Sequence, residues 1–389
     1  MATCGMYILS INRTASAPNY HLSFDQGNNG KPGKTQKASQ NQVQNQQKIA
    51  LSTSPNVNLP PMHQGLTASS LNELKKLAEY EKLSGGTVAD GIMTFTDIPD
   101  NISDAKSHAA ELATTLKEFA KFGIKPIVVM EPTNSGGTVD FSLYRQGGYD
   151  DIINALFQNL KDLGLTDKTI GMWVYFPEAN LPQWGPVDIA DFAPNVVRSV
   201  NIQKRLFPNS QATILLDAES YPAGSTDWSA GSYTSLAPFI SGIPHGLLDS
   251  FGLQGFPWAP PANQNSIDAS YDPKLFLDAS LASAAASLLS TKNIWFNTGT
   301  FASMYTSSSS ETVNLNASQR QIILDGVVNQ ALALKKHGFG VAINLFCQNK
   351  SNTNEAIDWS YSTTDSQAVF KNFAQQLYGN NLEMWLFDS

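Results

Sequence analysis

The chain of 389 residues is poor in cysteine and in histidine pairs, and both shortages exclude classes of protein. Cys4 and Cys347 are its only cysteines, which is too few for a disulfide framework or a zinc cluster. The five histidines show neither an HExxH motif nor another paired spacing for metal ligands. We therefore expect no metal centre, and nothing in the sequence indicates another cofactor.

Charge and long apolar runs are also scarce. Only 15% of the residues are charged and the formal net charge is -8, which argues against a nucleic-acid partner. No run approaches the roughly 18 apolar residues that cross a bilayer, so we expect no membrane insertion. The apolar residues 6–9 are too few for a signal peptide, so either the protein stays inside the cell or this is not the N-terminus of the full precursor. We expect a monomer.

What the chain does contain is a core and a polar N-terminal extension. Hydrophobic residues make up 42% and aromatic residues 10%, which is typical of a globular protein. Residues 26–47 are rich in Gly, Asn, Lys, Ser and Gln and offer almost nothing to bury. We predict a disordered linker or tail over residues 1–47, and a folded part that begins near residue 48.

From residue 48 onward, short apolar runs alternate with amphipathic helical patterns. The runs are almost continuously apolar, as strands of a parallel sheet buried on both faces must be. The eight predicted strands cover residues 49–54, 90–96, 127–131, the apolar start of 171–185, 212–217, 250–256, 294–297 and 341–347.

This alternation fits either a doubly wound sheet or a closed (β/α)8 barrel. No Gly-x-Gly-x-x-Gly turn follows the first strand, and polar residues follow nearly every strand instead of gathering at one switch point. We predict an α/β fold: a single (β/α)8 TIM barrel over residues 48–380, with a C-terminal tail over 381–389.

The candidate site residues follow the predicted strands, where the active site of such a barrel forms. Carboxylates, amides and aromatic rings without a phosphate loop indicate a carbohydrate cleft, because rings stack on sugars and carboxylates supply acid, base or nucleophile. The candidates are Glu131, Glu178, Asn180, Trp184, Asp217, Glu219, Tyr221, Gln254, Asn297, Trp258 and Trp359.

Each candidate also has a structural interpretation. Glu178 closes a buried aromatic strand, where removal from water favours the protonated form that a general acid needs, but it can equally be a loop ligand. Asp217 and Glu219 can be catalytic or can cap the next helix. Glu131 suits a structural hydrogen-bond acceptor beneath the site. Individual tryptophans are mostly core residues, although Trp184 and Trp258 lie in proline-flanked loops.

The order of the motifs resembles glycoside hydrolase family 26, which belongs to the retaining clan A barrels and contains mainly β-mannanases. The resemblance covers most of residues 48–378. The matching segments are Gly147-Gly148-Tyr149-Asp150, Pro177-Glu178-Ala179-Asn180 with Trp184-Gly185, Asp249-x-x-Gly252-Leu253-x-Gly255-Phe256, Asn297-Thr298-Gly299 and Asp358-Trp359.

The resemblance implies that Glu178 is the general acid/base. It places the nucleophile at residue 297, where this chain has Asn297, and an amide cannot attack as a carboxylate does. Phe256 stands where the family has the tyrosine that contacts the nucleophile, so the surroundings of that position have changed as well. Asp217 or Glu219 is the best substitute carboxylate.

Three hypotheses follow. The first is a hydrolase of a β-linked polysaccharide, of mannan type or another glycan. The second is a catalytically weakened barrel that binds a polysaccharide or oligosaccharide, and the third is a structural module that binds no sugar. The resemblance also implies an extracellular or cell-surface location.

Overall fold

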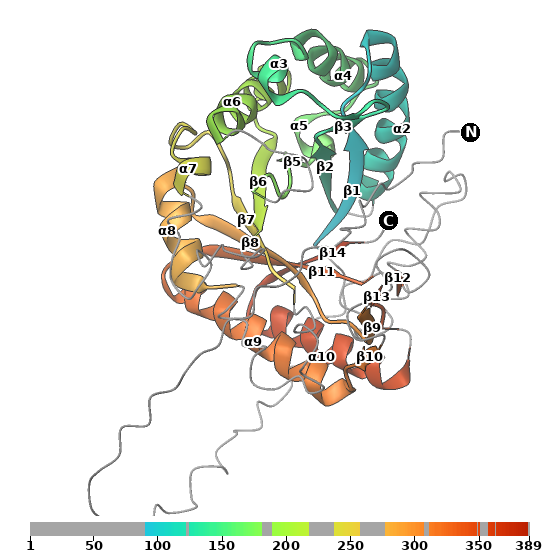
Figure 1. Ribbon diagram of the computed structural model, residues 1–389, viewed down its shortest axis with the longest axis vertical. Coiled ribbons are helices and arrows are strands. Elements are labelled where there is room, and N and C mark those ends of the chain that lie inside the picture. Colours follow the sequence, from blue (N-terminus) through green and yellow to red (C-terminus); the bar gives the residue numbers. More distant parts are fainter. Residues whose placement is uncertain are drawn as a thin grey trace, which may run out of the picture.

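Eight parallel strands close into a barrel in the computed structural model, which describes residues 90–121, 124–180, 189–217, 237–256, 277–306, 311–347, 349–350, 357–361 and 363–387. The order around the barrel is β1-β14-β11-β8-β7-β6-β5-β2 (Figure 1). The strands are β1 (Gly91–Asp97), β2 (Lys125–Glu131), β5 (Met172–Tyr175), β6 (Gln211–Asp217), β7 (Phe251–Gln254), β8 (Asn293–Gly299), β11 (Gly340–Phe346) and β14 (Glu383–Phe387).

Helices surround the barrel (Figure 1). They are α2 (Ile102–Lys121), α3 (Phe141–Arg145), α4 (Asp150–Asp162), α5 (Asp167–Ile170), α6 (Ile189–Leu206), α7 (Ala237–Ile240), α8 (Ala279–Leu289), α9 (Ala317–Lys336) and α10 (Thr364–Gly379). No helix among the described residues is long and apolar enough to span a membrane. The predicted α/β TIM-barrel class is confirmed.

Side chains at the helix starts explain why several helices begin where they do. Asn316 and Thr363 each accept a hydrogen bond from the third residue of α9 and α10, and both make reciprocal capping boxes. Asp278 accepts two backbone N–H groups at the start of α8. These caps satisfy amide donors that a helix start otherwise leaves without partners.

The barrel strands are buried on both faces. Every residue of β5 and β7 is buried, and only the first residue of β8 and of β11 is exposed. Packing is close enough to require glycine at Gly252, because a Cβ there would lie 2.3 Å from the ring of Trp295. That indole in turn donates to Thr213 Oγ1 at 3.0 Å. The continuous apolar runs of the sequence thus reflect burial on two sides.

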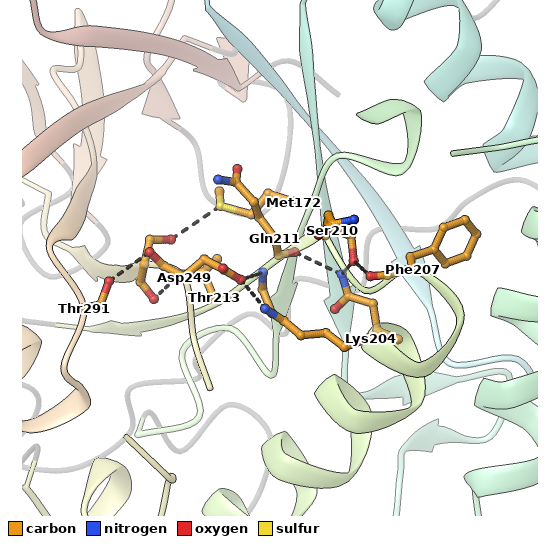
Figure 2. Close-up of polar contacts among 12 residues, drawn as sticks. Met172, Lys204, Phe207, Ser210, Gln211, Thr213, Asp249 and Thr291 are labelled. Carbon is orange, nitrogen blue, oxygen red and sulfur yellow. Dashed lines mark hydrogen bonds and ion pairs between the residues drawn. The ribbon is translucent and has the colours of Figure 1, made fainter. Parts of the chain in front are cut away.

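Asp249 ties together the N-terminal ends of three strands (Figure 2). Its Oδ2 accepts from Lys204 Nζ and from the backbone N–H of Ala212, both at 2.8 Å. Its backbone carbonyl accepts from Thr291 Oγ1 at 2.8 Å, just before β8. Since Asp249 itself precedes β7, these bonds hold β6, β7 and β8 in one register.

Two small antiparallel sheets are formed by segments that follow barrel strands. The hairpin of β3 (Thr133–Asn134) and β4 (Gly137–Thr138) follows β2. A four-stranded sheet has the order β10-β9-β13-β12. Its strands come from the segments after β8 and β11: β9 (Ser303–Thr306), β10 (Glu311–Asn314), β12 (Asn349–Lys350) and β13 (Ile357–Asp358).

The strand that completes the barrel is not among those predicted. The predicted strand 49–54 and the linker 1–47 lie outside the described residues, whereas β14 pairs with both β11 and β1. The predicted tail over 381–389 is therefore wrong, because Glu383–Phe387 is a barrel strand. Asp90 secures it: its backbone N–H donates to Met384 O at 2.7 Å, and its carboxylate accepts from Met384 N at 2.9 Å.

A first prediction concerns β14. We expect a chain truncated after residue 380 to lose cooperative unfolding, because β1 and β11 would then expose unpaired strand edges. Circular dichroism during thermal unfolding measures this. A matched chain truncated after Phe387 keeps β14 and should unfold like the full chain. Equal unfolding of all three chains would contradict the role of β14.

A second prediction concerns Asp90, whose pKa is raised chiefly by burial, although the Met384 N–H bond lowers it. Glu383 raises it further and Lys125 lowers it. A raised pKa in the folded state contributes stability below the unfolded pKa, about 3.9, and that contribution is lost as pH rises through the folded pKa.

The parent chain should therefore lose stability as the pH rises from about 3 to about 7, whereas Asp90→Asn, which keeps an acceptor for Met384, should not. The stability of Asp90→Asn relative to the parent chain should be higher at about pH 7 than at about pH 3. Thermal unfolding at the two pH values measures the difference. A constant difference would show that Asp90 does not titrate in this way.

Candidate functional site

Polar side chains from adjacent strands stand in register at one end of the barrel. Asp217 of β6 pairs in register with Gln254 of β7, Gln254 with Asn297 of β8, and Asn297 with Asn344 of β11. Glu178 follows β5, the neighbour of β6. We call these five residues the polar belt. Glu178, Asp217 and Gln254 end or follow a strand, which is where active sites of (β/α)8 barrels form. Asn297 and Asn344 lie two residues before the ends of theirs.

Hydrogen bonds join the belt into one network. Gln254 Nε2 donates to Glu178 Oε1 in a short bond, and lies 3.4 Å from Asp217 Oδ2. On its other side, Gln254 Oε1 accepts from Asn297 Nδ2 at 2.6 Å. Asn297 Oδ1 in turn accepts from Asn344 Nδ2 at 2.6 Å. One amide group therefore bridges two carboxylates, with two further amides behind it.

Burial differs along the belt. Asn344 is completely buried, and the exposed fractions of Asp217, Gln254 and Asn297 are 4%, 6% and 6%. Glu178 is only half-buried. Solvent therefore reaches the belt mainly at Glu178, and the remaining members interact in a medium of low dielectric constant, where hydrogen bonds and charges act strongly.

An unusual backbone positions the Glu178 carboxylate. Phe176 and Glu178 have φ angles of +47° and +56°, in the left-handed region that side chains with a Cβ rarely adopt. The backbone N–H of Glu178 donates to Leu215 O at 2.8 Å, which fastens the turn to β6. The Phe176 ring is fully buried against Tyr144, with centroids 5.2 Å apart. Strain of this kind is maintained by its surroundings and concentrates at functional sites.

Asn180 holds Asp217 in place. Its Nδ2 donates to Asp217 O at 2.8 Å, and its Oδ1 accepts from Asp217 N at 2.9 Å. The side-chain amide thus forms both hydrogen bonds that a neighbouring strand would form at this residue. Both of these amide contacts go to the backbone of Asp217 and fix the position of that carboxylate, and substrate binding by Asn180 stays a prediction.

An aromatic cluster lies beside the belt, at the ends of β7 and β11. The Phe256 ring centroid is 5.1 Å from that of Trp359 and 5.8 Å from that of Phe346. Trp359 is only 2% exposed and Phe256 9%. Buried Arg320 donates to Thr300 O at 2.7 Å, which anchors α9 to the end of β8. Trp359 was predicted to contact sugar; it packs in this cluster, and sugar contact remains a prediction for both rings.

The structure brings together four of the predicted site residues: Glu178, Asp217, Gln254 and Asn297. Glu131 lies half-buried at the end of β2, in register with Asp97. The remaining predicted residues lie outside the described part of the chain: Trp184, Glu219, Tyr221 and Trp258.

Sequence reasoning missed Asn344. The signal was present, since a single amide stands inside the apolar strand VAINLF and a buried amide needs a hydrogen-bond partner.

Within the described ranges, no group of three His, Cys, Asp or Glu side chains could hold a metal ion.

Comparison with known proteins adds only a likeness of fold. No protein-family model matches the chain, and no curated protein matches it. Among solved structures, an endo-β-1,4-mannanase from Thermotoga petrophila is 12% identical, with a TM-score of 0.49 over 78% of this chain and 73% of that one.

Two further solved structures are similar to the same degree. A family 1 β-glucosidase from Thermotoga maritima is 11% identical, with a TM-score of 0.47 over 80% of this chain and 87% of that one. A structure of two fungal β-1,4-galactanases gives 15% identity and a TM-score of 0.49 over 79% of this chain and 98% of that one. Similarity this low carries no argument about the site, which has to be judged from its own geometry.

A third prediction tests the bridge. We expect Gln254→Glu to be less stable at pH 8 than at pH 5, because three adjacent carboxylates cannot all ionise out of water. A shift of about two pKa units in the shared proton corresponds to about 2.7 kcal/mol. Urea unfolding at both pH values measures the loss. Gln254→Met is the control: it removes the donor without adding a charge, so its loss of stability between pH 5 and pH 8 should be smaller than that of Gln254→Glu. The same pH dependence in both variants would contradict the position of residue 254 between the two carboxylates.

Proposed function

We propose that this protein is a glycoside hydrolase that cleaves a β-linked polysaccharide, with Glu178 as general acid/base and Asp217 as the second carboxylate. The observation that carries the proposal is the Gln254 amide in contact with both carboxylates at the mouth of the barrel. Hydrolysis of a glycosidic bond requires such a pair of carboxyl groups on either side of the bond.

The shared amide limits how far apart the two carboxylates lie. The N–H bonds of an amide diverge by about 120°, and acceptors at normal hydrogen-bond length along them are roughly 5–6 Å apart. Retaining glycosidases place their carboxyl groups about 5–5.5 Å apart, whereas inverting enzymes need about 6.5–9.5 Å to admit a water. The geometry therefore favours a retaining reaction.

The surroundings favour different roles for the two groups. Glu178 is half-buried and can exchange protons with solvent, as an acid/base must between two steps. Asp217 is nearly fully buried, and Asn180 fixes its backbone from both sides, which suits a nucleophile that has to meet one carbon.

The reaction would then run in two steps. Glu178 gives its proton to the glycosidic oxygen while Asp217 attacks the anomeric carbon, so that the C–O bond breaks and a glycosyl ester forms. Glu178, now ionised, takes a proton from water, whose oxygen attacks the same carbon and releases Asp217. The product keeps the anomeric configuration, and both carboxyl groups return to their starting states.

This assignment moves the nucleophile away from Asn297. The Asn297 amide is engaged by Gln254 on one side and by Asn344 on the other. An amide in that position supports the carboxylate pair but does not attack carbon. For the substrate we propose a β-mannan first, on the family resemblance of the motifs, and for the location the cell exterior or surface on the same ground.

The second candidate function is glycan binding without turnover. The observation in its favour is that β8 supplies an amide where the family resemblance places a nucleophilic carboxylate. The two candidates differ in a measurable way, because only the hydrolase releases reducing ends.

The fourth prediction concerns activity. We expect release of reducing sugar from at least one member of a panel of mannans, xylans and glucans. Glu178→Gln and Asp217→Asn should each lower kcat about 10²–10⁴-fold, because each removes proton transfer or attack. Glu111→Gln, at an exposed carboxylate of α2, is the matched control and should keep full activity.

Equal background release by the parent chain and Glu178→Gln would exclude hydrolysis. Calorimetric titration of the same glycans then separates the other hypotheses: heat of binding would favour the glycan-binding barrel, and its absence would favour the structural module.

A further inference from the structure

We propose that Asn344 and Asn297 are positioning residues of the active site, forming a relay of amides that keeps the N–H groups of Gln254 turned toward Glu178 and Asp217. The inference rests on the proposed function and extends it to two side chains that lie behind the amide bridging the carboxylates. Asn344 lies two hydrogen bonds away from the amide that bridges the carboxylates.

The direction of the relay follows from the chemistry of the carboxylates. The ionised Asp217 carboxylate only accepts hydrogen bonds, and Glu178 accepts at Oε1 while its other oxygen can carry the proton, so Gln254 has to present Nε2 to both. Its Oε1 then faces Asn297, which has to donate through Nδ2. The Oδ1 of Asn297 is left for Asn344, which also has to donate. Each amide has one permitted orientation, set by the charge at one end.

The relay works in the opposite direction as well. An amide side chain can rotate by half a turn and exchange its donor and acceptor ends at little steric cost. If Gln254 turned, its Oε1 would face the ionised Asp217 carboxylate, and Glu178 would have to direct its proton at that oxygen instead of at the substrate. Asn297 prevents the turn by donating to Oε1, and Asn344 fixes Asn297 in the same way.

The burial of Asn344 favours this role over a purely structural one. The residue is fully buried in an apolar strand, between Ile343 and Leu345. Its Oδ1 is a buried atom without a hydrogen-bond partner in the described structure. A side chain that only stabilised the barrel would satisfy both ends or be apolar. Within the described residues, the Asn344 side chain makes one hydrogen bond, and that bond leads to the carboxylates.

The aligned amides also act electrostatically. All three direct their N–H ends toward the carboxylate pair, in a part of the barrel where Asn344, Asn297 and Gln254 are almost entirely buried. Consecutive hydrogen bonds polarise one another there, and donors aimed at a carboxylate favour its ionised form. Breaking the first bond of the chain should therefore favour protonation of the pair.

Other titratable groups near the strand ends stay constant in such a test. At the C-terminal ends of the described barrel strands, and among the residues directly after them, they are Asp97 of β1, Glu131 of β2, Tyr175 of β5 and Cys347 after β11. None of them is altered by substitution of Asn344, so a change in titration of the pair would report on the relay.

The experiment compares three variants of the full chain. Asn344→Leu removes the donor and leaves the relay without a fixed end. Asn344→Asp reverses it, because a carboxylate there draws the N–H groups of Asn297 and Gln254 away from the site. Thr298→Val is the matched control. Thr298 belongs to β8 and, like Asn344, is fully buried with a side-chain oxygen that has no hydrogen-bond partner among the described residues.

Carboxyl groups labelled with ¹³C in Glu and Asp are titrated by NMR, with Glu178→Gln and Asp217→Asn used for assignment. We expect the apparent pKa of the pair to rise by about half a unit or more in Asn344→Leu, further in Asn344→Asp, and not at all in Thr298→Val. The acidic limb of the kcat/KM profile should move by the same amount. Near-UV circular dichroism checks that each variant is folded. If Asn344→Asp does not fold, the titration of Asn344→Leu alone tests the relay.

Unchanged titration in folded Asn344→Leu would overturn the relay, and so would an equal shift in Thr298→Val. The titration needs no turnover. A shift in a protein that hydrolyses none of the glycans would therefore support the relay and count against the proposed function.

Discussion

The contact between the Gln254 amide and the carboxylates of Glu178 and Asp217 determines the arrangement of the whole site. Two carboxyl groups brought close together repel one another when both are ionised, and this repulsion favours a proton on one of them. An amide with two N–H groups placed between them supplies a donor to each. In the proposed function, the same contact keeps the pair at the short separation that a retaining reaction needs.

The framework beneath that contact is the register of the strands. Asp249 joins the starts of β6, β7 and β8, so their far ends deliver Asp217, Gln254 and Asn297 side by side. Strain in the turn after β5 places Glu178 against the same group. The backbone thus positions the two carboxylates, and the oriented amides donate hydrogen bonds to them, so that no metal ion is needed to stabilise their charge.

Much of the fold could be predicted from the sequence because its strands are apolar runs that polar residues terminate. The same feature located Glu178, Asp217, Gln254 and Asn297, since each ends or follows such a run. The strand β14 could not be assigned in this way, because a short apolar run does not show which strands it pairs with, and the place of β14 depends on β1 and β11. Two roles likewise required contacts that a sequence does not contain: Asn180 bonds to the backbone of Asp217, and Asn344 bonds to Asn297.

The central claim is that Asp217, not residue 297, completes the catalytic pair with Glu178. Its most direct test is to trap the glycosyl ester with activated 2-deoxy-2-fluoro glycosides and to find the modified residue by peptide mass spectrometry. The account predicts a stable adduct on Asp217 that is absent in Asp217→Asn. An adduct on Glu178, or on a carboxylate outside the polar belt such as Glu219, would contradict it.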